Sequence, residues 1–131
     1  MNNLEKFWKN GRLKSLLFFS ILLTSLVLFT LPGSKVPTIS WLNIPHLDKI
    51  IHNIIFFSLS TSLYIWLAAA FPPIKKKGVI VMILILVGYG IAIEFIQDNL
   101  IEGRSFEIKD ILADTSGCLI FFICYLIYRR C

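Results

Sequence analysis

The chain has 131 residues, of which 56% are hydrophobic and 16% charged, and its formal net charge is +5. An ordinary soluble domain has about a quarter of its residues charged, so this composition argues against a conventional water-soluble enzyme. The mean hydropathy of +0.77 comes from long apolar runs. Each run is close to the ~20 residues that a helix needs to cross ~30 Å of hydrocarbon.

Four such runs follow one another along the chain. The first covers residues 13–31, with one charge, Lys14, near its start, and the others cover 50–71, 79–97 and 110–128. No proline interrupts any of them, and the connections are too short to hold a separate folded domain. We therefore predict an all-α fold, an integral membrane four-helix bundle, as a single domain over residues 1–131.

Basic residues gather at one end of the predicted bundle. That end carries nine basic residues, including the run at 75–77, against the single acid Glu5, whereas the other end carries four bases and seven acids. Short loops rich in Lys and Arg stay in the cytoplasm, so we predict that both termini are cytoplasmic. The same bases are explained as topology signals and contacts to anionic lipid, and no nucleic-acid partner is expected.

Three pairs of polar residues lie at the outer ends of the second, third and fourth runs. The pairs are Asp48 with His52, Glu94 with Gln97, and Asp110 with Asp114. Residues three or four apart share a helix face, and carboxylates avoid lipid, so these faces are expected to point inward and to converge at one depth. Gly90 and Gly117 continue two of the faces, where small residues permit close helix approach.

Several of these residues also have a purely structural interpretation. Asp110 is in a first helical turn, where it can cap the helix or complement its positive end, and Lys49 can reach the lipid headgroups. Arg104 can pair with an acid of its own loop, Glu102 or Glu107. Glu94 is harder to explain in this way, because it ends a long uncharged run and precedes no helix start. An ionisable residue in such a position favours a functional role.

The order and spacing of these residues resemble those of the VanZ-like family. The fragments are Asp48-Lys49-x-x-His52, Gly90-x-x-x-Glu94-x-x-Gln97, Gly103-Arg104 and Asp110-x-x-x-Asp114-x-x-Gly117. The resemblance covers about residues 48–117, and it departs at Asp114, where the family commonly has Asn. It implies a small multi-pass protein of the bacterial cell membrane, from a family whose named member is associated with low-level teicoplanin resistance. It implies no settled reaction.

We predict one ligand-binding site on the extracytoplasmic side. Its residues are Asp48, Lys49, His52, Glu94, Gln97, Arg104, Asp110 and Asp114. The first hypothesis is binding of a membrane lipid or a lipid-linked cell-wall intermediate, with the guanidinium of Arg104 holding phosphate in a bidentate grip. The second is a membrane enzyme in which His52 and Glu94 act as general base and acid. The third is a non-catalytic assembly factor.

No metal site or cofactor is expected from the sequence. It lacks the His-Glu-x-x-His pattern, and one histidine beside scattered carboxylates is weak support for zinc. Cys118 and Cys124 lie in the last run without the spacing of a metal site. The oligomeric state stays open, since the Gly88-x-x-x-Ala92 pair can pack helices within one chain or between two copies of a homo-oligomer.

Overall fold

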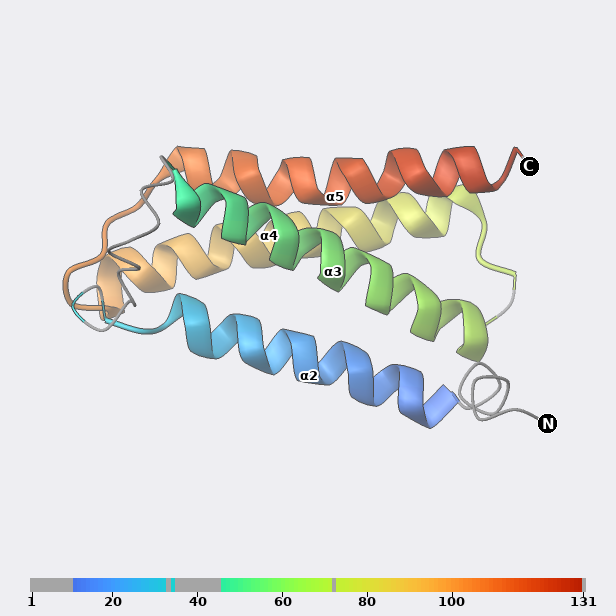
Figure 1. Cartoon of the computed structure of the whole chain (residues 1–131), viewed down its shortest axis with the longest axis horizontal. Coiled ribbons are helices and arrows are strands. Elements are labelled where there is room, and N and C mark those ends of the chain that lie inside the picture. The colour runs from blue at the N-terminus through green and yellow to red at the C-terminus, as the bar shows by residue number, and fades with distance from the viewer. Residues whose placement is uncertain (1–10, 33, 35–45, 72, 131) are drawn as a thin grey trace.

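The computed structural model describes residues 11–32, 34, 46–71 and 73–130. These residues form four α-helices and no strand: α2 (Gly11–Phe29), α3 (Leu47–Ala70), α4 (Lys76–Leu100) and α5 (Ile108–Tyr128) (Figure 1). All four helices are long and apolar enough to cross a membrane. The prediction of an all-α protein with four membrane-spanning helices is therefore confirmed.

Three of the helices extend further at their polar ends than the apolar runs predicted, since α5 also begins at Ile108, before the predicted start at residue 110. Helix α3 begins at Leu47, before the predicted start at residue 50, and α4 continues to Leu100, past the predicted end at residue 97. An apolar run ends where the hydrocarbon ends, whereas a helix continues as long as its backbone hydrogen bonds do. The additional turns bring Asp48 and Asp98 into the helices and extend the polar end of the bundle.

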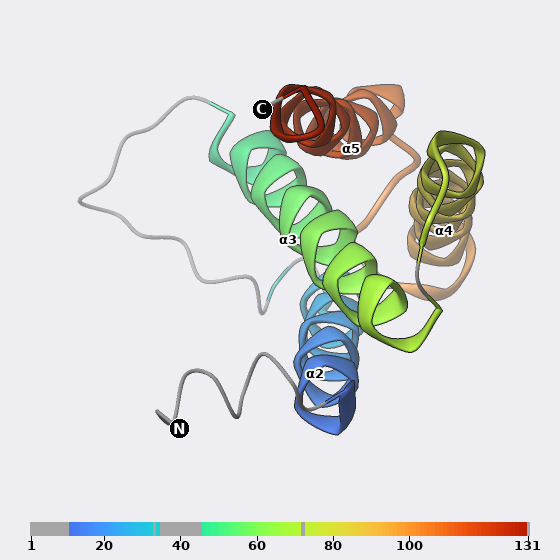
Figure 2. The ribbon, with the colours of Figure 1, turned by 90° about the vertical axis from the view of Figure 1, so that its right-hand side faces the viewer.

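Successive helices run in opposite directions. The start of α2 and the end of α5 therefore lie at the same end of the bundle, as a protein with both termini on one side of the membrane requires (Figure 1). The assignment of this end to the cytoplasm stays a prediction. Helix α3 is central, since it packs most extensively against α5, then against α2, and also against α4, which in turn packs against α5 (Figure 2).

Apolar side chains lie both inside the bundle and on its outer surface. Phe56 and Leu59 of α3 are completely buried, and Ile93 of α4 is almost so. Leu84 and Ile123, by contrast, lie on outward faces with more than half of their surface exposed. A helix that is apolar all round is typical of a membrane span, because lipid solvates the outer face.

Helices α3 and α5 approach closely at Gly117. A Cβ atom added there would collide with the backbone oxygen of Asn53 and lie 3.0 Å from the backbone nitrogen of Phe57. The side chain of Asn53 donates hydrogen bonds across the same crossing to Ser116 Oγ (2.5 Å) and to the carbonyl oxygen of Ala113 (3.4 Å). The predicted role of Gly117 in close helix approach is confirmed.

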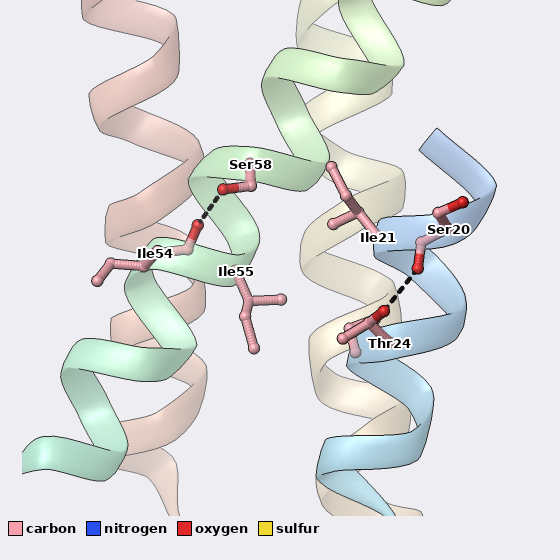
Figure 3. Close-up of a pocket in the computed structure, with 7 residues that line it drawn as sticks. Ser20, Ile21, Thr24, Ile54, Ile55 and Ser58 are labelled. Carbon is pink, nitrogen blue, oxygen red and sulfur yellow. Dashed lines mark hydrogen bonds between the residues drawn. The ribbon is translucent and has the colours of Figure 1, made fainter. Parts of the chain in front are cut away.

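A pocket of about 250 Å³ lies between the middle turns of α2 and α3 (Figure 3). Its polar atoms are mostly engaged, since the hydroxyls of Thr24 and Ser58 donate to the carbonyl oxygens of Ser20 and Ile54, one turn earlier in the same helices. None of the predicted site residues lines it. This pocket is therefore separate from the polar end of the bundle.

Candidate polar site at one end of the bundle

The predicted site residues meet where α2 ends, α3 begins, α4 ends and α5 begins. Most of them are buried despite their polarity, namely His52, Glu94, Gln97, Asp110 and Asp114. Asp48 is exposed, and Lys49 and Arg104 are half-buried. The three polar faces therefore converge, as expected.

Lys49 lies at the centre of a group of carboxylates. Its Nζ atom is 2.7 Å from Asp110 Oδ1, 2.8 Å from Glu107 Oε2 and 2.5 Å from Asp48 Oδ2. The side chain is 17% exposed, so the interpretation that it extends to the lipid headgroups is wrong. The ammonium group instead joins the first turn of α3 to the start of α5, and Asp110 pairs with it across the bundle.

His52 and Asp114 form a buried pair between α3 and α5. Nδ1 of His52 is 2.9 Å from Asp114 Oδ1, and the two side chains are 5% and 1% exposed. The ring of Phe29, at the end of α2, stacks on the imidazole with 4.3 Å between centroids. An ionised carboxylate only accepts hydrogen bonds, so Nδ1 carries the proton in this pair, and in neutral imidazole Nε2 then keeps a free lone pair.

Glu94 supports the start of α5, which its place in the sequence did not indicate. Its Oε2 atom accepts a 2.8 Å hydrogen bond from the backbone N–H of Glu107, the residue that caps α5. Its Oε1 atom is buried and has no hydrogen-bond partner among the described residues. One oxygen of this carboxylate therefore has a structural role, while the other is available.

Gln97 and Arg104 both contact the end of α2. Gln97 Nε2 donates to the carbonyl oxygen of Phe29 (2.8 Å), and Arg104 Nε donates weakly to that of Leu31 (3.4 Å). The last carbonyls of a helix lack partners within the helix, and Gln97 satisfies that of Phe29, whereas Leu31 lies two residues past the end of α2. In the described part of the chain Arg104 forms no ion pair, and the predicted pairing with Glu102 or Glu107 is not seen.

Asp114 has a second oxygen that the site leaves without a partner. Its Oδ2 atom is buried, and no described residue forms a hydrogen bond with it. A Cβ atom added at Gly90 would come within 2.6 Å of this oxygen, so the glycine makes room for the carboxylate. Burying a carboxylate oxygen without a partner is costly, so this position differs from ordinary helix packing.

Two sets of three side chains bring metal-ligating atoms within 4.8 Å of one another. They are His52 with Glu94 and Asp110, and Asp48 with Glu107 and Asp110. The first set is entirely buried and comes from three different helices, whereas two members of the second set are exposed.

Three contributors to the site were not predicted from the sequence. Glu107 provides a carboxylate to Lys49 and a backbone N–H to Glu94. The ring of Phe29 stacks on His52, and Asn53 bonds to Ser116 where α3 crosses α5. Asn53 could have been found, because a carboxamide inside an apolar run usually has a partner on another helix. Nothing in the pattern distinguishes Phe29 from the other apolar residues around it.

Comparison with known proteins agrees with the resemblance in the sequence. The family model described as VanZ/LLP1 matches residues 3–129, which is wider than the segment that carries the polar motifs. No curated protein and no solved structure matches the chain.

Proposed function

The chain belongs to the VanZ-like family, and from this starting point we propose that it binds the headgroup of a membrane lipid or a lipid-linked cell-wall intermediate. The binding site is the polar end of the bundle, on the extracytoplasmic side of a bacterial cell membrane. Through this binding the protein changes the susceptibility of the cell to teicoplanin-type glycopeptides. The charge asymmetry of the two ends supports the orientation.

The observation that carries this proposal is the state of Arg104. Arg104 is half-buried, yet among the described residues the one hydrogen bond of its guanidinium is the long contact from Nε to the carbonyl oxygen of Leu31. A guanidinium has five N–H donors in a planar fork that matches phosphate, and it stays charged at any physiological pH. Arg104 therefore provides the anion-binding group, whereas the ammonium of Lys49 is already paired with three carboxylates at 2.8 Å or less.

A second candidate function rests on His52 and Glu94. Asp114 orients the imidazole of His52 through Nδ1, and Glu94 has a free buried oxygen, which is the arrangement of an oriented base beside a carboxyl group. In this alternative the protein is a membrane enzyme that performs acid–base chemistry on the bound headgroup. Release of headgroup products from lipids by purified wild-type protein, and its loss in His52→Gln, distinguishes catalysis from binding alone.

The binding proposal is tested with Arg104→Gln and, as a matched control, Lys109→Gln, which removes an exposed positive charge at the start of α5. Teicoplanin susceptibility is measured in a sensitive bacterial host, with the membrane abundance of each protein checked by immunoblot. The phosphorus content of lipid that co-purifies with each protein in detergent provides a direct readout of binding.

We expect wild type and Lys109→Gln to raise resistance and to retain more lipid phosphorus than Arg104→Gln. If Arg104→Gln, at equal abundance, matches wild type in both measurements, anion binding by this guanidinium is wrong. If the phosphorus differs while susceptibility does not, headgroup binding stands and the link to resistance is wrong.

A further inference from the structure

We propose that His52, Glu94 and Asp110 bind a divalent transition-metal ion, and that Zn²⁺ is the ion that this set of donors fits best. The three side chains come from α3, α4 and α5 and lie at the same depth of the bundle. This inference goes beyond the proposed function and does not depend on it. It also differs from the expectation of no metal, because the sequence does not show that these three residues meet.

The geometry is close to that of a bound ion. One ligand atom from each of the three residues lies within 4.8 Å of the other two. Zinc bonds to imidazole nitrogen and carboxylate oxygen are about 2.0–2.2 Å long and arranged as a tetrahedron, so ligand atoms around one ion lie about 3.3–3.6 Å apart. The three side chains would move toward one another to bind the ion.

The orphaned oxygen of Glu94 is an independent indication of a ligand. Glu94 is fully buried, and the hydrogen bond from the Glu107 backbone to Oε2 fixes the orientation of the carboxylate. Oε1 is left without a hydrogen-bond partner among the described residues. A negatively charged oxygen that is buried and unpaired requires a proton or a cation nearby.

His52 is arranged as metal-binding histidines usually are. Such histidines donate one ring N–H to a carboxylate or carbonyl, which fixes the tautomer and directs the other nitrogen at the ion. Nδ1 of His52 makes this bond with Asp114 at 2.9 Å, and the described residues give Nε2 no hydrogen-bond partner. Asp114 is therefore a positioning residue that supports the ligand and does not bind the ion itself.

The balance of charge also requires a cation. Glu94, Asp110 and Asp114 are three buried carboxylates, and among the residues that the structure describes Lys49 is the one basic side chain apart from His52 within ion-pair distance of any of them. When His52 is neutral, two negative charges remain, which a divalent cation neutralises.

The second set of metal-ligating atoms provides a contrast. Asp48, Glu107 and Asp110 also lie close together, but the ammonium of Lys49 is 2.5–2.8 Å from all three carboxylates. A cation thus already occupies the centre of that group, whereas no described side chain does so in the set of His52, Glu94 and Asp110. With three protein ligands, a zinc ion keeps a coordination position open for water or for an oxygen of an anionic headgroup.

The test uses the full chain purified in detergent, stripped of metal with a chelator, loaded with Zn²⁺ and desalted. Elemental analysis then gives the ratio of zinc to protein. We expect one ion per chain for wild type and its loss in Glu94→Gln, which keeps the shape of the side chain and an acceptor for the Glu107 N–H. Asp98→Asn is the matched control, because it neutralises an exposed carboxylate one turn along α4 and is expected to bind as wild type does.

Asp114→Asn provides the second variant, since it keeps all three ligands and changes only the support of His52. Asparagine keeps an acceptor for Nδ1 but lacks the negative charge that makes the imidazole a stronger ligand. A change to such a supporting carboxylate weakens metal binding by about 10–100-fold, which competition with a chelator of known affinity measures. The absorption spectrum of bound Co²⁺ reports coordination by imidazole and carboxylate, and circular dichroism checks that each variant is folded.

The proposal is overturned if wild type retains no stoichiometric zinc, or if folded Glu94→Gln binds zinc with unchanged affinity. If Glu94→Gln does not fold, an unchanged affinity in Asp114→Asn overturns it instead. Arg104→Gln is expected to bind zinc as wild type does, so failure of headgroup binding and failure of metal binding are separate results.

Discussion

The carboxylate of Asp114 is held by one hydrogen bond from His52, while its second oxygen lies against Gly90. Both members of the pair are almost completely buried, so water cannot replace either of them when the other is removed. Leaving a buried donor without its acceptor costs about 1–3 kcal/mol, more than the net stabilisation of a typical hydrogen bond. The identity of residue 114 therefore affects the stability of this end of the bundle as well as any ligand.

Asp114→Ala and Asp114→Asn separate these effects. Alanine leaves Nδ1 of His52 unpaired, so we expect the free energy of unfolding to fall by about 1–3 kcal/mol. Asparagine removes the charge but keeps an oxygen that accepts from Nδ1, so we expect a change within about 0.5 kcal/mol of wild type. Titration with SDS in mixed micelles, followed by circular dichroism, measures both values. Equal losses in the two variants would show that the charge, rather than the hydrogen bond, stabilises the pair.

At the level of single residues, spacing predicted which polar side chains meet but not how they pair. Asp110 and Asp114 share a face because they are four apart, and that periodicity is visible in the sequence. Their partners, Lys49 and His52, depend on how α3 and α5 are rotated against each other, which no local pattern determines. The bond from Glu107 to Glu94 depends on the path of the loop between α4 and α5, so the sequence did not predict it.

Among the helices, α3 and α5 are joined most extensively, and at Gly117 the backbone of α3 leaves no room for a side chain on α5. Without a hydrophobic driving force in lipid, close backbone packing and hydrogen bonds between helices provide the stabilisation. The bonds from Asn53 to Ser116 and Ala113 lie directly beside the glycine. One short stretch of α5 thus fixes the rotation that aligns the polar residues one and two turns above it.

Gly117→Ala tests this crossing, with Gly88→Ala as its matched control. The added methyl group at residue 117 meets backbone atoms of α3, whereas an atom added at residue 88 meets nothing within 4 Å. We expect Gly117→Ala to lower the free energy of unfolding by about 1–3 kcal/mol, as overpacking usually does. Gly88→Ala is expected to leave it unchanged or slightly higher, because alanine favours helix. If Gly117→Ala is as stable as wild type, the two helices adjust freely and the crossing is not tight.

The helices themselves were predictable for a physical reason. In lipid each backbone N–H and C=O must be paired within the protein, so an apolar run of sufficient length has almost no alternative to a helix. The polar turns at the helix ends carry no such constraint. Leu47 and Leu100 therefore lie outside the predicted spans, although both belong to helices.

For the whole molecule, the four antiparallel helices place the acidic loop between α4 and α5 at the end opposite the basic run at 75–77. Topology is determined mainly by the lysine and arginine residues of short loops. The acidic end, which contains the polar site, is thus expected to face away from the cytoplasm.

Single cysteines at positions 102 and 76, introduced as Glu102→Cys and Lys76→Cys after the three native cysteines are replaced by alanine, test this orientation. In intact cells we expect a membrane-impermeant maleimide to label position 102, and to label position 76 only after lysis. Labelling of 76 with protection of 102 would reverse the topology and place the polar site in the cytoplasm.

Each of the four helices contributes to the site. Helix α5 supplies Asp110 and Asp114, the carboxylates that pair with Lys49 and His52 of α3. Ribosomes synthesise the chain from its N-terminus, so Lys49 and His52 enter the membrane before the carboxylates of Asp110 and Asp114 have been made. Until α5 is inserted, the imidazole of His52 lacks Asp114, and the ammonium of Lys49 has Asp48 beside it but neither Glu107 nor Asp110. A chain without α5 thus leaves the polar groups of α3 without most of their partners, and the site is assembled only once α5 has been inserted.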